Sequence, residues 1–245
     1  MTTEETTVLL SEDHGPVRVI RLNRPEKHNA LNTELTTALL DELLAADTAS
    51  SVRAVVLAGE GRSFCAGADI TEFADLTPGN QDAVVRRADL TARTQLLPQQ
   101  LSKPIVSVVW GAALGGGAGL AIGCDMMVVT DDVKFGYPEL KHSLVPAIVM
   151  TGLQRQIGRK LAFEMISHGK LLGAGDLVRL GLANRCVDRD KALGIGIEIA
   201  ARWSEPSPTA MAATKDLFYR VADLPVEQAM RAGRDVNAIM RGFRG

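Results

Sequence analysis

Residues 111–125 read GAALGGGAGLAIGCD, and this glycine-rich stretch decides how the rest of the chain is interpreted. It follows the apolar segment 103–111, so Gly115, Gly116 and Gly117 stand where a buried strand turns into a helix. The first N–H groups of a helix have no intrahelical partner, and glycine lets a ligand approach them closely. The stretch therefore predicts a site for a phosphate or a developing oxyanion, or else close packing between helix and strand.

The two common phosphate-binding patterns do not fit this stretch. The dinucleotide fingerprint GxGxxG would place a third glycine where the chain has Leu120, and no Lys-Ser/Thr pair follows as a P-loop requires. An oxyanion hole needs two N–H donors. The loop 61–70, GRSFCAGADI, contains a second glycine turn just after the buried segment 52–59. The two turns can therefore point their N–H groups at a common place.

The first two-thirds of the chain alternates strand and helix patterns, which predicts an α/β layer. We expect a hairpin over 7–24 and a helix over 32–47 that Asn32 or Thr33 caps. Further strands are expected over 52–59, 103–111, 126–130 and 133–140, and further helices over 80–101, 158–169, 192–203 and 226–241. The predicted organisation is an α/β core over 1–190 followed by a helical region over 191–245.

Composition and charge exclude several classes of protein. Of the 245 residues 46% are hydrophobic but only 4% are aromatic, which predicts a large aliphatic core. The formal net charge of −2 offers no basic face for nucleic acid or for a membrane surface. The three cysteines are dispersed, so neither a disulfide scaffold nor a metal site is expected. The opening MTTEETT lacks the features of a signal peptide, which predicts a cytoplasmic protein.

Three segments resemble the signature segments of the enoyl-CoA hydratase/isomerase family, also called the crotonase family: FCAGADI (64–70), WGAALGGGAGLAIGCD (110–125) and FGYPELKHSLVP (135–146). The segments 22–32 and 171–188 are similar to two further parts of that family, and the resemblance covers roughly residues 8–220. It implies a crotonase-like spiral of repeated ββα units whose C-terminal helices build trimers, which pair into hexamers. It also implies an acyl-CoA thioester as the small-molecule partner, with coenzyme A as part of the substrate and no separate cofactor or metal.

The resemblance assigns roles to residues of this chain. The N–H groups of Ala68 and Gly116 would hold the thioester carbonyl and stabilise an enolate, and Glu139 of the Pro-Glu dipeptide would be the acid/base. In an apolar pocket the pKa of Glu139 would rise toward the range useful for that work. The residues implied to contact coenzyme A are Lys27, His28, Ala66, Ala68, Asp69, Ile70 and Gly116.

The chain departs from the hydratase pattern at Gly119. Family hydratases carry a glutamate there, and it shares a water with the glutamate of the Pro-Glu dipeptide. A glycine has no side chain that could hold a water or move a proton, whereas Glu139 alone can carry a proton between C2 and C4 of an acyl chain. We therefore favour isomerisation of a 3-enoyl to a 2-enoyl thioester. The alternatives are hydration of a 2-enoyl-CoA, decarboxylation or C–C cleavage of a CoA ester, and a CoA-ester-binding protein with little catalysis.

Other residues are candidates for the pocket. Tyr137 would share one face of a strand with Glu139, and His142 follows three residues later. The stretch from Pro146, PAIVM, is bulkier than the glycine-rich sequence of many hydratases and would reshape the acyl end of the pocket. The family usually continues past MRGFRG (240–245) into a helix that helps to close the coenzyme A site, so that helix is expected to be short or missing. The remaining candidates are Trp110 as a pocket wall and Glu72 and Asp75 as further bases.

Overall fold

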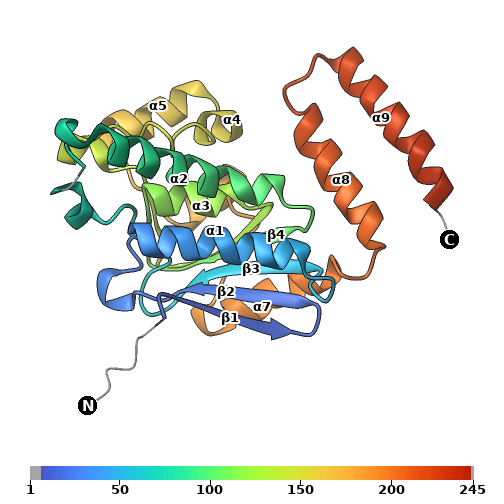
Figure 1. Cartoon of the computed structure of the whole chain (residues 1–245), viewed down its shortest axis with the longest axis horizontal. Coiled ribbons are helices and arrows are strands. Elements are labelled where there is room, and N and C mark those ends of the chain that lie inside the picture. The colour runs from blue at the N-terminus through green and yellow to red at the C-terminus, as the bar shows by residue number, and fades with distance from the viewer. Residues whose placement is uncertain (1–6, 75, 244–245) are drawn as a thin grey trace.

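The computed structural model, which describes residues 7–74 and 76–243, is built around a sheet with helices on both faces (Figure 1). The main sheet has the strand order β1-β2-β3-β4-β6-β8. β1 (Leu9–His14) and β2 (Val17–Leu22) form the expected antiparallel hairpin. All the other neighbours in this sheet are parallel: β3 (Ala54–Gly59), β4 (Ile105–Val109), β6 (Met126–Thr130) and β8 (Arg185–Val187).

A second, two-stranded sheet carries the chain from the main sheet to the glycine-rich helix. It pairs β5 (Ala112–Leu114) in parallel with β7 (Lys134–Gly136). Between β4 and β5 the chain turns at Gly111, whose φ is +57°. A Cβ at this position would collide with the carbonyl oxygen of Arg62, so the turn requires glycine. The succession β4, β5 and α3 (Gly116–Gly123) is one ββα unit.

Helices cover the two faces of the main sheet because successive strand residues point to opposite sides. On one face Val55 and Leu57 pack beneath α1 (Thr33–Thr48), α2 (Gln81–Gln100) and α3. On the other face Val56 and Val108 pack against α7 (Arg189–Arg202). Asn32 caps α1 by accepting the N–H of Leu35 at 2.9 Å, which confirms one of the two expected caps.

Shorter elements complete the layer around the pocket. The α-helices among them are α4 (Leu153–Ile157), α5 (Arg159–His168) and α6 (Ala174–Arg179). The 3₁₀ turns are η1 (Pro25–Lys27), η2 (Ile70–Ala74), η3 (Pro78–Asn80), η4 (Glu139–His142) and η5 (Arg241–Phe243). Within the described ranges, no helix is long and apolar enough to cross a membrane.

The last two helices form an arm that extends away from the sheet (Figure 1). They are α8 (Pro208–Val221) and α9 (Val226–Met240). The expected boundary at residue 190 coincides with the start of α7, but α7 packs on the sheet through Ala192 and Ile199. The part that stands apart from the core is therefore α8–α9 and not the whole of 191–245.

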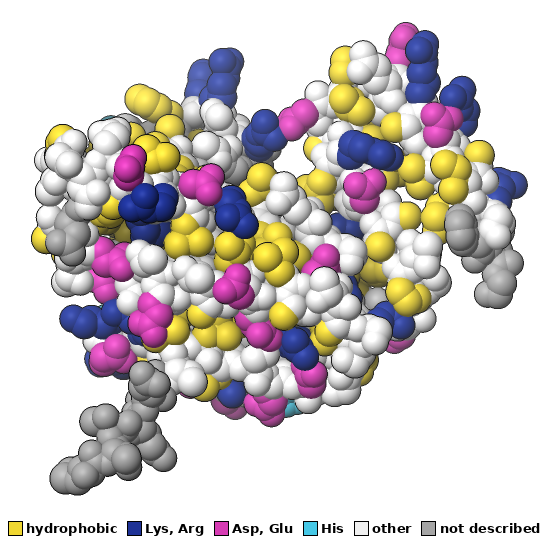
Figure 2. All heavy atoms as spheres, viewed as in Figure 1, with side chains coloured by type: hydrophobic (Ala, Val, Ile, Leu, Met, Phe, Trp, Pro, Cys, Tyr) yellow, Lys and Arg dark blue, Asp and Glu magenta, His cyan; other side chains and the backbone are white. Residues whose placement is uncertain are grey.

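The arm is anchored to the core through α8 and exposes apolar side chains. The Lys215 ammonium is buried and lies 2.7 Å from Asp125 Oδ2. The Tyr219 hydroxyl donates to the other carboxylate oxygen at 2.8 Å. Figure 2 shows hydrophobic side chains on this arm, and Val226 and Met230 are 75% and 71% exposed.

Candidate active site

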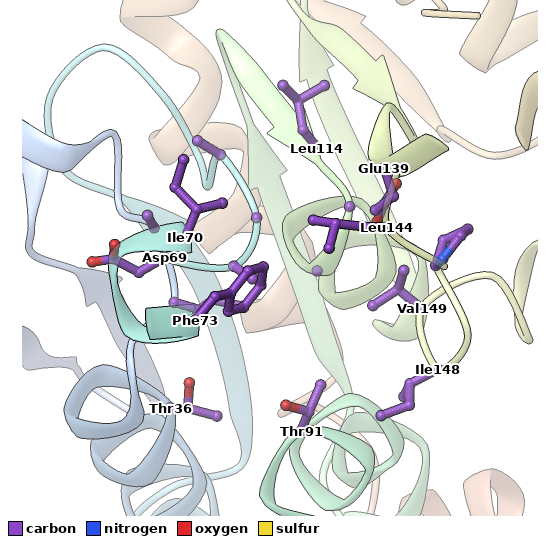
Figure 3. Close-up of a pocket in the computed structure, with 18 of the residues that line it drawn as sticks. Thr36, Asp69, Ile70, Phe73, Thr91, Leu114, Glu139, Leu144, Ile148 and Val149 are labelled. Atoms are coloured by element: carbon purple, nitrogen blue, oxygen red, sulfur yellow. The ribbon is translucent and has the colours of Figure 1, made fainter. Parts of the chain in front are cut away.

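A cavity of about 680 Å³ lies between the loop after β3, helix α2 and the segment that follows β7. Its size is within the range of small-molecule sites. In Figure 3 Ile70 and Phe73 face Leu144 and Val149 across this cavity, and Glu139 lies on the Leu144 side. The cavity is lined by nine of the residues expected at the site: Lys27, Ala66, Ala68, Asp69, Ile70, Gly116, Glu139, His142 and Pro146.

The N–H of Ala68 is turned toward α3 by the pairing of its neighbours. Leu31 N–H donates to the carbonyl of Gly67 at 2.7 Å, and Asp69 N–H donates to the carbonyl of Leu31 at 3.1 Å. In this parallel pairing the residues on either side of Ala68 bond to Leu31, so Ala68 directs its own N–H to the opposite side. Gly67 has a φ of +100°, and a Cβ there would lie 2.9 Å from the carbonyl oxygen of Leu114. Only glycine lets the loop come this close to the end of β5.

Gly116 is the first residue of α3, and its N–H lies beside the N–H of Ala68. Gly115 precedes it with a φ of +50°, so the helix starts abruptly after β5. A Cβ on Gly116 would lie 4.0 Å from the nitrogen of Ala68, so the two N–H groups are neighbours. Among the described residues, neither N–H has a hydrogen-bond acceptor. Two unpaired donors therefore lie together on the cavity wall.

Glu139 places a carboxylate beside these donors. It stands in η4, and a Cβ on Gly115 would lie 2.6 Å from its Oε1. Its Oε2 is buried and has no hydrogen-bond partner within the described part of the chain. Burial raises the pKa of Glu139, while its own backbone N–H and His142 oppose the shift in part. A carboxyl group with a raised pKa suits the transfer of protons near neutral pH.

Gln95 is a cavity residue that the sequence reasoning missed. It lies on α2, and its Nε2 donates to the carbonyl oxygen of Gly116 at 2.8 Å. Its side chain covers Gly119, where a Cβ would collide with Oε1 and come within 3.1 Å of Cδ. No local motif marks this residue, because only the packing of α2 on α3 brings it to the site.

Two of the expected pocket residues lie elsewhere. Tyr137 and Glu139 do not share a strand face, because β7 ends at Gly136 and Glu139 belongs to η4. The Tyr137 ring is fully buried and packs edge-on against the Phe135 ring, with the two ring centroids 5.9 Å apart. Burial raises the pKa of the Tyr137 hydroxyl. Trp110 donates from Nε1 to the carbonyl of Gly61 at 3.1 Å and is not among the residues that line the cavity.

Two further expected residues lie behind the lining rather than in it. Gly119 is covered by Gln95 and contributes no atoms to the cavity wall. His28 adopts a left-handed backbone conformation, and its Nδ1 lies 3.0 Å from Ser63 Oγ. It is not part of the cavity lining, whereas its neighbour Lys27 is. Of these two neighbouring residues, Lys27 is therefore the one that lines the cavity.

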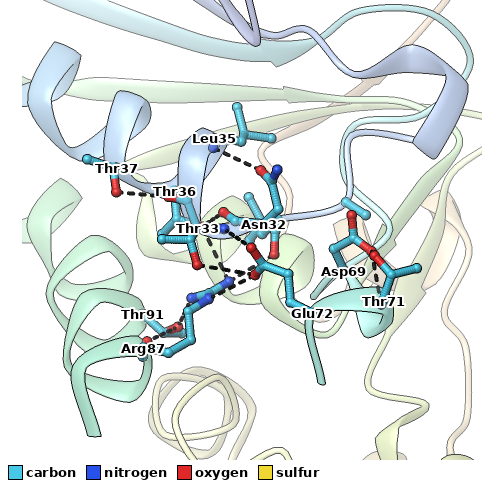
Figure 4. Close-up of polar contacts among 12 residues, drawn as sticks. Asn32, Thr33, Leu35, Thr36, Thr37, Asp69, Thr71, Glu72, Arg87 and Thr91 are labelled. Atoms are coloured by element: carbon cyan, nitrogen blue, oxygen red, sulfur yellow. Dashed lines mark hydrogen bonds and ion pairs between the residues drawn. The ribbon is translucent and has the colours of Figure 1, made fainter. Parts of the chain in front are cut away.

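The acidic residues of the 69–72 loop are paired. Asp69 accepts the Thr71 hydroxyl at 2.7 Å and Arg24 Nη2 at 2.9 Å, and these bonds lower the pKa of Asp69. Figure 4 shows Glu72 between helices α1 and α2, where it accepts the N–H of Thr33 at 2.8 Å and pairs with Arg87. These carboxylates hold the loop in place, and neither is a free base. Asp75 lies outside the described residues.

Comparison with known proteins identifies the family of this chain. Residues 12–239 match the family model described as enoyl-CoA hydratase/isomerase. The chain belongs to the enoyl-CoA hydratase/isomerase family. A 2,3-dehydroadipyl-CoA hydratase of Escherichia coli is 32% identical over 227 residues, which are 91% of this chain and 86% of that one. The chain is thus an enzyme of this family.

Solved structures of the family have the same fold but differ in the reaction their names give. The structure of an enoyl-CoA hydratase of Mycobacterium smegmatis has a TM-score of 0.89 and 31% identity, and the match covers 96% of this chain and 91% of that one. A monofunctional enoyl-CoA isomerase of the same species has a TM-score of 0.78 and 28% identity, with 92% and 99% of the two chains covered. The comparisons confirm the expected crotonase fold and leave both reactions open.

Proposed function

We propose that this enzyme converts an acyl-CoA thioester through an enolate that the N–H groups of Ala68 and Gly116 stabilise. The observation that carries the proposal is a pair of N–H groups that have no acceptor in the described part of the chain and lie beside the carboxyl group of Glu139. When a proton leaves the carbon next to a thioester, negative charge develops on the carbonyl oxygen. Donors fixed in advance around that oxygen stabilise the transition state more than the ground state.

Glu139 is the acid/base in this proposal, and double-bond isomerisation is the reaction that it supports best. Glu139 takes a proton from C2 of a 3-enoyl thioester, which gives a dienolate, and returns the proton to C4. The C2–H bond breaks, the C4–H bond forms, and the double bond moves into conjugation with the thioester. One carboxyl group suffices, and two carboxylates of the segment after β3, Asp69 and Glu72, are paired with arginines.

Hydration of a 2-enoyl-CoA is the second candidate. The family relative from Escherichia coli is named as a hydratase, which favours this reaction. Hydration adds the oxygen of water to C3 and a proton to C2. Glu139 would have to serve both steps, because Gly119 supplies no second carboxylate.

The remaining parts of the proposal concern the substrate and the assembly. Coenzyme A enters as part of the substrate and passes Lys27 and the loop 66–70, and no separate cofactor is needed. The exposed apolar side chains of α8–α9, among them Phe218 and Met230, favour a homotrimer or hexamer in which the arms contact neighbouring subunits. A cytoplasmic location stays a prediction.

The ultraviolet absorbance of the conjugated enoyl thioester tests the reaction directly. The purified enzyme receives a 3-enoyl-CoA and a 2-enoyl-CoA in parallel. We expect the signal to appear from the 3-enoyl ester and Glu139→Gln to slow this by about 10²–10⁴-fold. The matched control is Glu164→Gln, because Glu164 is exposed on α5 and pairs with Lys170 on the surface.

The other outcomes separate the alternatives. Loss of signal from the 2-enoyl ester at a comparable rate would establish hydration and refute the preference for isomerisation. No change with either ester, together with saturable binding of acyl-CoA, would refute the catalytic proposal in favour of a binding protein.

A further inference from the structure

The amide of Gln95 occupies a space that the cavity would otherwise offer to water. Gly116, Gly119 and Gly123 present one side of α3 to α2, and a Cβ on Gly123 would lie 3.3 Å from the backbone oxygen of Gln95. Because these positions carry no side chains, α2 comes close enough for Gln95 to lie directly against α3. The gap that a side chain at Gly119 would fill is closed by the end of Gln95 and by Val149, whose Cβ lies 3.3 Å from the Cβ position of Gly119.

The orientation of the amide follows from its partner. Nε2 faces the carbonyl oxygen of Gly116 at 2.8 Å and must be the donor, which places Oε1 over Gly119. The bond fixes the amide to the residue whose N–H points at the proposed oxyanion. Oε1 accepts no hydrogen bond within the described ranges. An amide oxygen can accept a hydrogen bond, but it cannot take up a proton at neutral pH.

Gln95 and Glu139 flank Gly116 from two sides. The carboxylate lies against Gly115 and the amide lies against Gly116 and Gly119. The reacting carbons of a thioester held at Gly116 therefore have a proton-transferring group on one side and a neutral group that transfers no proton on the other. A water molecule that attacks C3 needs room and polar partners beside those carbons.

We propose that Gln95 determines the outcome of the reaction by excluding this water, so that the proton removed by Glu139 returns to carbon. The inference rests on the proposed function and adds to it the residue that keeps isomerisation free of hydration. Gln95 is a positioning residue here, because it takes part in no bond that is made or broken. Without the Gln95 amide, a water enters beside the 2-enoyl thioester that isomerisation has formed. The ionised Glu139 then takes a proton from this water as its oxygen bonds to C3, and returns the proton to C2.

A matched pair of substitutions tests the inference. Gln95→Ala removes the amide and opens space for a water, which takes up about 30 Å³. Gln95→Met also removes the bond to the Gly116 carbonyl, but it keeps a side chain of similar length in the gap. Any effect that comes only from the lost hydrogen bond is therefore common to both variants.

The readout is the ratio of 3-hydroxyacyl-CoA to 2-enoyl-CoA formed from a 3-enoyl-CoA, measured by liquid chromatography and mass spectrometry at early times. A ratio of products does not depend on the fraction of each variant that folds. We expect the wild-type enzyme and Gln95→Met to form almost no hydroxyacyl product. For Gln95→Ala we expect a rise of the ratio by about tenfold or more, and more deuterium at C2 when the reaction runs in D₂O.

Each outcome decides one of the two proposals. If the wild-type enzyme isomerises and the two variants give the same ratio as each other, this inference is wrong and the proposed function stands. If the wild-type enzyme hydrates as readily as it isomerises, the water is not excluded, and the inference fails together with the preference for isomerisation. If the wild-type enzyme converts neither ester, the proposed function fails and Gln95 has no such role.

Discussion

Replacing Lys215 with methionine tests what holds the α8–α9 arm to the core. The Lys215 side chain is only 4% exposed. Its Nζ donates to Asp125 Oδ2 and to the carbonyl oxygen of Pro98, each at 2.7 Å, and to the carbonyl of Lys103 at 2.8 Å. Methionine keeps most of the aliphatic length and removes all three bonds. The substitution therefore isolates the contribution of the ammonium group.

The expected loss follows from the burial of the partners. Removing one side of a buried ion pair costs about 3–5 kcal/mol, because the other charge stays buried. Asp125 reduces this loss, since its side chain is 15% exposed and keeps the bonds from Ile105 N–H at 2.7 Å and the Tyr219 hydroxyl at 2.8 Å. Burial lowers the pKa of Lys215, so its removal also relieves a desolvation cost. We expect a loss of about 3 kcal/mol in the free energy of unfolding.

Thermal unfolding followed by circular dichroism measures this loss. For a chain of this size about 3 kcal/mol lowers the Tm by about 6–12 °C. The matched control is Lys191→Met, because Lys191 pairs with Asp188 on the open surface of α7, and we expect no measurable change in its Tm. If Lys215→Met melts within about 2 °C of the wild type, the pair does not anchor the arm and the reasoning from burial is refuted.

Three further predictions concern the site, the thiols and the arm. Glu139 accepts a proton only when it is ionised, and burial raises its pKa. We therefore expect kcat/KM to fall with decreasing pH, and to do so at a higher pH than it would for an ordinary carboxyl group. A fall of kcat/KM at the pH of an ordinary carboxyl group would contradict this. Burial raises the pKa of Cys65 to about 12, whereas Cys186 is exposed. Iodoacetamide at pH 8 should therefore modify Cys186 and leave Cys65 intact. Equal labelling of the two cysteines in mass spectra of the native protein would contradict this prediction. Met230→Glu should lower the mass measured by light scattering if the apolar arm joins subunits, whereas an unchanged assembly would exclude that role for this face.

Local sequence patterns predicted most of the fold because they depend on neighbouring residues. The strand β6 (Met126–Thr130) and helix α2 (Gln81–Gln100) lie within one residue of the expected ranges. The prediction of a helical region over 191–245 did not include where its first helix, α7, packs. Ala192 and Ile199 look like an ordinary amphipathic stripe, and only the structure shows that this stripe faces the sheet.

The residues of the site also differ in whether a local sequence motif reveals them. Glu139 could be predicted because it lies in a motif of consecutive residues, as do the glycines around Ala68 and Gly116. The prediction that Tyr137 and Glu139 share one face of a strand was wrong, because the strand ends before Pro138 and a 3₁₀ turn begins. Gln95 has no signal in the sequence at all. It is an ordinary polar residue of an amphipathic helix, and its position over Gly119 depends on how closely two helices pack.

That packing changes the meaning of Gly119. In the sequence the glycine counts only as the absence of a carboxylate, but in the fold it also lets α2 approach α3. A glutamate at residue 119 would require the Gln95 side chain to leave the gap and would break its bond to Gly116. The two positions therefore compete for one space beside the proposed oxyanion. Restoring a carboxylate at 119 alone would displace the Gln95 amide from the carbonyl of Gly116, so a two-carboxylate site requires changes on both helices.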